Sequence, residues 1–359
     1  MRTLLFYILR QIIATLIFSL VALSVIFIVV NYLDNLDKFL DDNAPTFVVV
    51  MFYLHSLPEI LKILTPVGTL SSVLFVIGKL TTNNEITAMK SGGLSLYKLM
   101  VPILFFGVIL SVGQVYFSGW IVPIANQKKN LFEQKYMRKA PGGQIYNLYF
   151  RDSSTKNINI NFYDPDKKTG NKVVLEEFTN EKTPRLIKRL EADEMKWDSI
   201  SMMWILKKIT KRDFINDKVE LVHIDSTKVK LNISHSQIAN LRRSEDELNF
   251  DERRDYIELM RTGGKDVRRD MIDYYGDWAF PFANFIVILF GVPFASIKKK
   301  GGMAVQITAA LLICLFYLIF TKVSQSIGYS IAIPAQLSAW SANIIFFVIG
   351  IFNLFKTRT

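Results

Sequence analysis

Six long apolar stretches constrain this chain more than any other feature of its sequence. A helix that crosses the roughly 30 Å hydrocarbon layer of a bilayer needs about 20 mostly apolar residues. The stretches with that character are residues 12–32, 63–77, 99–121, 278–297, 303–321 and 337–355. The second is short, but its apolar character extends back through residues 48–57, which indicates one long, tilted or projecting helix. The sequence therefore predicts a membrane protein with six transmembrane helices in two groups of three.

Basic residues flank these helices unevenly. Lysine and arginine are enriched in the cytoplasmic loops of membrane proteins. With the N-terminus in the cytoplasm, ten of the 13 basic residues outside residues 124–275 lie inside, and only Lys38, Lys62 and Lys322 lie on the other side. Of the acids outside the same segment, Glu85 alone falls inside. We therefore predict cytoplasmic termini, and we assign the net charge of +11 to membrane topology rather than to nucleic-acid binding.

Residues 124–275 are predicted to form a water-facing domain between the third and fourth helices. They hold 30 of the 43 basic and 25 of the 32 acidic residues, which is typical of a soluble surface. Alternating apolar and polar residues predict short strands at 144–151, 157–163, 172–178, 201–210, 219–224 and 228–233. Many short strands favour an all-β, jelly-roll-like fold. A polar stretch, 244–261, is predicted to be a connecting helix that stops at Gly263-Gly264.

The expected organisation is thus three parts. Residues 1–123 hold the first three helices with a cytoplasmic loop at 81–95, residues 124–275 form the external domain, and residues 276–359 hold the last three helices.

Several short motifs resemble a known family. They are Leu57-Pro58 and Pro66-Val67-Gly68 in the second helix, the run Asn-Glu-Ile-Thr-Ala-Met-Lys-Ser-Gly-Gly at 84–93, and the segments 281–283, 291–295, 298–302, 333–334 and 340–343. In this order they resemble the LptF/LptG permeases of the lipopolysaccharide transport system. One departure is Asp277, four positions before Pro281, where family members often carry a basic residue.

The resemblance implies a half-transporter in a bacterial inner membrane, with its large domain in the periplasm. Members of this family pair with one another and with a cytoplasmic LptB-type ATPase, and they extract lipopolysaccharide from the outer leaflet of the inner membrane. The external domain is expected to pass the lipid to LptC/LptA-type periplasmic jelly-roll proteins, joined by β-augmentation. Lipid would enter between the first helix of one protomer and the fifth of its partner, which here implies a gate at residues 21–30 and 312–321.

The cytoplasmic loop 81–95 is the predicted ATPase-coupling site. Glu85, Ala88 and Met89 have the spacing of one helical face, and Gly92 lies in the Gly-Gly pair that ends the turn. The competing interpretation is a solvated loop acid. The isolation of Glu85 among inside lysines, and the family's use of this position to contact the ATPase, favour coupling.

The three lysines on the outer side form a second candidate site. Lys62 and Lys322 lie about 25 Å and 33 Å of helix away from the inner lysines Lys79 and Lys300, so both fall near the outer interface. With Lys38, they could bind the phosphates of a lipid headgroup. The alternatives are snorkelling to the interface and, for Lys62, a local ion pair with Glu59.

Catalytic motifs are missing from the sequence. Gly78-Lys79-Leu80 and Gly264-Lys265-Asp266 lack the remaining residues of a phosphate-binding loop, the three histidines are scattered, and Cys314 is the only cysteine. We therefore expect no enzymatic activity, cofactor or metal in this chain, with ATP hydrolysed by a partner subunit. The alternative function is a non-transporting membrane receptor or assembly scaffold whose external domain binds a protein.

Overall fold

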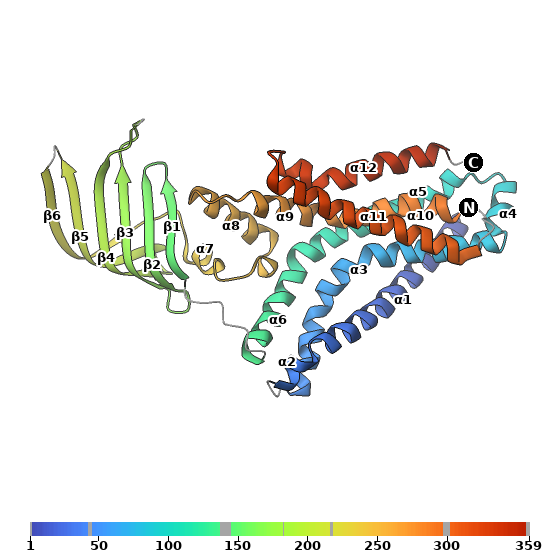
Figure 1. The fold of residues 1–359 in the computed structure, drawn as a ribbon, viewed down its shortest axis with the longest axis horizontal. Helices are drawn as coiled ribbons and strands as arrows, with labels where there is room; N and C mark the ends of the chain where they lie inside the picture. Colours follow the sequence, from blue (N-terminus) through green and yellow to red (C-terminus); the bar gives the residue numbers. More distant parts are fainter. Residues whose placement is uncertain are drawn as a thin grey trace. The chain divides into compact units, whose positions relative to one another are not determined.

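The computed structural model describes residues 2–41, 45–136, 145–181, 183–215, 218–296 and 302–356. The chain divides into two compact units (Figure 1). Residues 1–139 and 268–359 form the helical unit, and residues 140–267 form the inserted unit. The segments 124–139 and 268–275, which we expected in the external domain, therefore belong to the helical unit. Ion pairs and hydrogen bonds explain this, because Lys129 binds Glu59 and Arg268 binds backbone carbonyls of residues 328–333.

The helical unit consists of long helices. Its described elements are α1 (Arg2–Asp34), α2 (Leu36–Asp41), α3 (Thr46–Thr82), α4 (Glu85–Ser91), α5 (Leu96–Tyr116), the π-helix η1 (Phe117–Ile121), α6 (Val122–Tyr136), α9 (Arg268–Ala279), η3 (Phe280–Phe282), α10 (Ala283–Ala295), α11 (Gly302–Ser330) and α12 (Ala335–Lys356). Within the described residues, six helical segments are long and apolar enough to cross a membrane. The predicted set of six spans is confirmed, and the second span is the single long helix that the sequence suggested.

Proline marks the irregular points of these helices. Pro123 has no N–H group to continue the α-helical pattern, and directly before it the backbone widens into η1, where the Val122 N–H donates to the carbonyl of Phe117. A continuous rod, α5-η1-α6, results. Pro281 lies in the short 3₁₀ turn that separates α9 from α10. The first half of the fourth span, α9, is amphipathic and begins ten residues before the apolar stretch at 278.

The two ends of the helical unit differ in their packing. Figure 1 shows α4 at one end and α2 at the other. Near α4, aliphatic side chains from α1, α3, α5 and α10 form the main core, where Gly107 lets α5 approach Ile288 closely. At the α2 end the core is aromatic: Phe39, Phe52 and Tyr53 pack edge to face and hold α2 against α1 and α3.

The inserted unit contains one antiparallel sheet. Its strands are β1 (Ile145–Ser153), β2 (Lys156–Asp164), β3 (Thr169–Phe178), β4 (Leu186–Asp198), β5 (Met203–Ile215) and β6 (Lys218–Val229), and each pairs with its neighbour along the chain. The inserted all-β domain is thus confirmed. The jelly-roll detail is not, because the strand order is that of a simple meander.

A line of irregular pairing crosses all six strands. Every ladder skips one residue on each strand at the same level, and the skipped residues are Asn147, Asn161, Lys172, Asp193, Lys208 and Asp225. Those on β1, β3 and β5 have positive φ angles of 50° to 51°. Core-facing residues are therefore three apart across this line instead of two, as in the pairs Ile160/Tyr163, Ala192/Met195 and Leu206/Ile209. We call this line the bulge row.

The bulge row explains where the strand predictions fail. β4 was not predicted because its alternation reverses at Asp193, in the middle of the strand. β6 was predicted as two strands, 219–224 and 228–233, which separate at Asp225. Period-2 alternation cannot reveal a strand whose phase changes halfway.

Two helices and a short 3₁₀ turn complete the inserted unit: α7 (His235–Asn240), η2 (Glu245–Glu247) and α8 (Phe250–Thr262). The predicted connecting helix begins later than residue 244, because Asn249 and Glu252 form a capping box at the start of α8. It ends as predicted, with Gly264 at a φ of 77°. Ile238 of α7 and Leu259 of α8 pack against the sheet core.

Tyr163 and His235 connect β2 to α7 by a hydrogen bond of 2.6 Å to Nδ1. Burial raises the pKa of Tyr163, so its hydroxyl stays protonated and donates. Burial, together with the charge of Lys168, lowers the pKa of His235. Both effects favour the neutral imidazole as acceptor.

We expect the inserted unit to lose stability as the pH falls below about 6.5, the ordinary histidine pKa. The unfolded chain takes up a proton there, whereas the folded unit takes it up only at lower pH, so acid favours unfolding. Protection factors of β2 and β5 amides in the full-length protein should decrease between pH 7 and pH 5. His235→Gln should flatten this dependence, and His223→Gln, at an exposed position, should not. An unchanged profile in His235→Gln would contradict the assignment.

Candidate functional site

The predicted coupling loop contains a short helix, α4, anchored by an apolar face. Ile86 is buried and Met89 packs partly against the main core. Ala88 and Gly92 are exposed, and Glu85 is half-buried, with Oε1 accepting a 3.2 Å hydrogen bond from Asn83 Nδ2. Of the four predicted residues, Glu85, Ala88 and Gly92 thus remain available on the surface, and Met89 together with Ile86 holds the helix in place.

Two glycines end α4 in a Schellman motif. The N–H of Leu94 donates to the carbonyl of Met89, and the N–H of Gly93 donates to the carbonyl of Lys90. Gly93 has a φ of 86°, which a residue with a Cβ adopts only at a cost. The side chains of Met89 and Leu94 both pack on the core, so the motif fixes the exit of the helix.

Lys62 is paired with α9 and not with Glu59. Its Nζ lies 2.8 Å from Asp277 Oδ1, and both side chains keep partial exposure, 21% and 29%. The acid that departs from the family pattern is thus the partner of a predicted headgroup lysine. The local pair with Glu59 does not form, because Lys129 binds that carboxylate at 2.6 Å.

Lys322 contacts the same region of α9 indirectly. It is exposed, and its Nζ lies 3.4 Å from Oε1 of Gln325, one turn further along α11. Gln325 is buried against Gly276, next to Asp277 in the chain. Lys62 and Lys322 are therefore both connected to a single turn of α9. The side chain of Lys38 lies outside the described residues, as do Lys298, Lys299 and Lys300.

A buried polar network lies behind Lys62. Gln114 Nε2 donates to the Lys62 carbonyl at 2.8 Å, Asn284 Nδ2 donates to Gln114 Oε1, and Thr69 donates to Asn284 Oδ1 at 3.2 Å. The side chains belong to α3, α5 and α10, and all three are buried. In an apolar surrounding each of these groups would be costly without its partner, so the network fixes the relative positions of the three helices.

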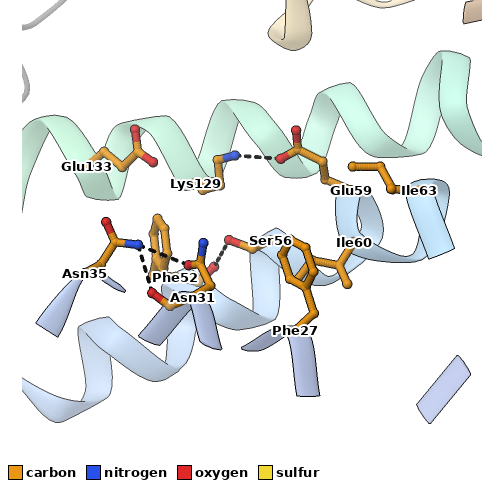
Figure 2. Close-up of a pocket in the computed structure, with 10 residues that line it drawn as sticks. All are labelled: Phe27, Asn31, Asn35, Phe52, Ser56, Glu59, Ile60, Ile63, Lys129 and Glu133. Atoms are coloured by element: carbon orange, nitrogen blue, oxygen red, sulfur yellow. Dashed lines mark hydrogen bonds and ion pairs between the residues drawn. The ribbon is translucent and has the colours of Figure 1, made fainter. Parts of the chain in front are cut away.

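A cavity of about 570 Å³ lies between α1, α3 and α6 at the α2 end (Figure 2). Each helix contributes one face with residues close to four apart, and Asn35, directly after the end of α1, continues the spacing of Phe27 and Asn31. The lining residues are Phe27, Asn31 and Asn35, then Phe52, Ser56, Glu59, Ile60 and Ile63, then Lys129 and Glu133. Figure 2 shows Lys129 and Glu133 on α6 facing α3 and the two asparagines. We call it the α1/α3/α6 cavity.

The sequence interpretation missed this cavity. Its signal was available, since Asn31/Asn35 and Lys129/Glu133 are polar pairs at helical spacing near the ends of apolar helices. We instead assigned α6 to the external domain, so that its charges were counted as part of a soluble surface.

In the part of the chain that the structure describes, six helices long and apolar enough to cross a membrane, together with an inserted six-stranded sheet, define a multi-pass membrane protein with one polar domain between its two halves. Residues 6–356 match the family described as lipopolysaccharide export system permease LptF/LptG. The chain belongs to this family, whose members are components of a transporter and not catalytic enzymes.

Two relatives illustrate the distance within the family. The lipopolysaccharide export system permease protein LptG of Haemophilus influenzae is 20% identical over 306 residues, or 83% of each chain. The protein of the same name from Escherichia coli K12 is 19% identical over 345 residues, which cover 94% of this chain and 93% of the relative. The similarity thus spans both groups of helices and the insertion.

Gly93→Ala should destabilise α4, whereas Gly92→Ala should not. Gly93→Ala places a Cβ on a residue with a φ of 86°. Gly92 has a φ of −78°, and a Cβ there meets no atom closer than 3.5 Å. The strain of roughly 1 kcal/mol predicts about fivefold more frequent opening of the helix. Hydrogen exchange of amides 86–91 measures it, and equal exchange in the two variants would refute the conformational argument.

Proposed function

We propose that this permease is the membrane subunit of an ATP-driven exporter that extracts lipopolysaccharide from the outer leaflet of the inner membrane and passes it to a periplasmic bridge. The observation that carries the proposal is α4. It presents Glu85 and Ala88 on its surface while Ile86 and Met89 pack into the main core. Because α4 is anchored in this way, a displacement of α4 by a bound partner would move α3 and α5 directly.

The proposed partners follow from this arrangement and from family membership. An LptB-type ATPase binds α4 on the cytoplasmic side, a second LptF/LptG-type permease completes the transport cavity, and LptC/LptA-type periplasmic proteins receive the lipid. In this orientation both termini are cytoplasmic and the inserted unit is periplasmic. The orientation is supported by the distribution of basic residues and by α1 beginning at the end that carries α4 (Figure 1).

Lipid entry is proposed along α1 and α11. In the proposed gate segments, Val21, Val25 and Val30 of α1 and Leu315 and Phe316 of α11 are exposed. Only 17% of the most apolar stretch of α1 is buried within the chain. Such faces suit a contact with acyl chains or a partner helix. Closure driven by ATP then lowers the affinity of the cavity for lipid, because only a difference in affinity between the two states does work on the cargo.

Lys62, Lys322 and Lys38 are the proposed headgroup-binding residues. An ammonium group has three donors, so Lys62 can bind a phosphate while it keeps Asp277. The pair with Asp277 holds the lysine at one position. The connection of Lys322 to the neighbouring residue of α9 supports a shared site.

The alternative is a receptor or assembly scaffold that binds a protein through its inserted unit. It leaves the anchored acidic helix α4 without a role. Co-purification separates the two: a stoichiometric ATPase subunit supports transport, and its absence supports the scaffold.

Glu85→Ala should leave the protein in the membrane but uncouple ATP hydrolysis from lipid extraction. The change removes the half-buried carboxylate at the start of α4 and keeps the anchor, Ile86. Thr87→Ala, at an exposed position of the same helix, is the matched control. ATPase activity and lipopolysaccharide release are measured together in proteoliposomes containing the partner subunits. Normal release by Glu85→Ala would exclude this role.

Lys62→Gln should weaken lipopolysaccharide binding roughly tenfold, the effect expected of one charge-assisted hydrogen bond to phosphate. Lys322→Gln tests the second lysine, and Lys79→Gln, exposed near α4, controls for the loss of one positive charge. Asp277→Asn frees Lys62 from its partner and should not weaken binding. Photocrosslinking to lipopolysaccharide provides the measurement. Undiminished crosslinking in Lys62→Gln would exclude headgroup binding by Lys62, and its ion pair with Asp277 would then have only a structural role.

A further inference from the structure

The α1/α3/α6 cavity has a charge pattern that differs from the proposed phosphate site. Three charged residues line it, Glu59, Lys129 and Glu133, and their formal charges sum to −1. A ligand that carries only phosphate would meet two carboxylates for one ammonium. The lining instead complements a ligand with both a cationic and an anionic group.

The positions of the charged side chains determine where each charged group of the ligand binds. Lys129 is 16% exposed, and its Nζ lies 2.6 Å from Glu59 Oε2. Since an ammonium has three donors, Lys129 can keep this bond and also bind a phosphate oxygen. Glu133 lies one turn away on the same face of α6, about 6 Å along the helix. A phosphate at Lys129 thus places a nearby ammonium within reach of the carboxylates.

The apolar part of the cavity fits the rest of such a molecule. Phe27, Phe52, Ile60 and Ile63 lie on the faces of α1 and α3 that also carry the polar groups (Figure 2). Phe27 and Ile63 keep exposures of 39% and 49%, so this part is not closed off. The cavity, at about 570 Å³, is within the usual range for small-molecule sites. An amphipathic molecule can place its polar end between the charges and its chains along the exposed apolar surface.

We propose that the α1/α3/α6 cavity binds a phosphoethanolamine group, the zwitterionic headgroup in which two methylenes separate a primary ammonium from a phosphate. The source to which we assign it is a glycerophospholipid of the surrounding leaflet, phosphatidylethanolamine, held at the α2 end of the helical unit. This site is separate from the proposed cargo lysines, and the proposal does not depend on transport.

Hydrogen-bond donors distinguish ethanolamine from choline. A primary ammonium donates three hydrogen bonds, and the acceptors for it are the carboxylates of Glu59 and Glu133. Asn31 Oδ1 is occupied, since it already accepts from Tyr53 at 3.2 Å and from Asn35 at 3.3 Å. A quaternary ammonium has the same charge and no donor. Phosphatidylcholine is therefore the matched ligand control, and the anionic phosphatidylglycerol tests whether phosphate alone is sufficient.

The test measures which lipids the full-length protein retains. The chain is purified from nanodiscs containing equal parts of the three lipids, and retained lipid is quantified by native mass spectrometry. We expect several-fold enrichment of phosphatidylethanolamine over both competitors. Preferred retention of phosphatidylglycerol, equal retention of the ethanolamine and choline lipids, or retention of all three in proportion to their supply would each overturn the proposal. This comparison uses the unaltered chain, so it does not depend on any variant folding.

Variants then assign the site. Lys129→Gln and Glu133→Gln should each reduce the enrichment roughly tenfold, because each removes one charged hydrogen-bonding group. Lys128→Gln, at an exposed position of the same helix, should leave it unchanged. Enrichment that survives both cavity variants would place the lipid elsewhere and refute the site.

Lipopolysaccharide that carries phosphoethanolamine is the second possible source. In a separate arm, nanodiscs contain phosphatidylethanolamine and lipopolysaccharide with or without this substituent. Displacement of the phospholipid only by the substituted form supports the headgroup chemistry and assigns the cavity to cargo. Displacement by both forms equally would contradict recognition of phosphoethanolamine.

Discussion

Backbone polar groups cannot remain unpaired in hydrocarbon, and the rest of this structure depends on that constraint. It requires continuous helices across the membrane, so that even proline is accommodated by local changes such as η1 before Pro123. Many polar side chains of the helical unit follow one of two arrangements. They are paired with one another inside the bundle, as Thr69, Gln114 and Asn284 are, or they gather where the helices leave the apolar layer.

The second arrangement gives the helical unit two chemically different ends. At one end, α4 rests on the main aliphatic core and presents an acid and small residues, a surface suited to a protein partner. At the other, an aromatic cluster supports α2, and the charges form ion pairs between helices, Lys62 with Asp277 and Lys129 with Glu59. Partial exposure leaves these pairs accessible to a headgroup without leaving a charge unpartnered in a medium of low dielectric. The proposed protein and lipid contacts are thereby separated along the helices.

The inserted unit follows a different constraint, that of a sheet with one apolar face. Its helices α7 and α8 pack on the same core as the strands, and the bulge row shifts the inward positions of all six strands by one residue at a common level. Lysines at 172 and 208 accept a left-handed backbone there, which costs energy for any residue with a Cβ. Because the shift occurs on every strand, pairing continues across it and the sheet stays intact.

The sequence by itself determined the six spans, the inserted all-β domain, the Gly-Gly end of α4 and the family, because hydrophobic length, alternation and turn residues act locally along the chain. Tertiary structure decided the remainder. Alternation changes phase at Asp193 and Asp225, and β4 and β6 stay continuous there because the neighbouring strands are irregular at the same level. Lys62 pairs with Asp277 and not with Glu59, because Lys129 already binds Glu59. The same ion pair between Lys129 and Glu59 connects α6 to α3 and so places α6 in the helical unit. Competition between partners distant in sequence is a property of packing, so the polar pairs Asn31/Asn35 and Lys129/Glu133 could not show by themselves that they line the same cavity.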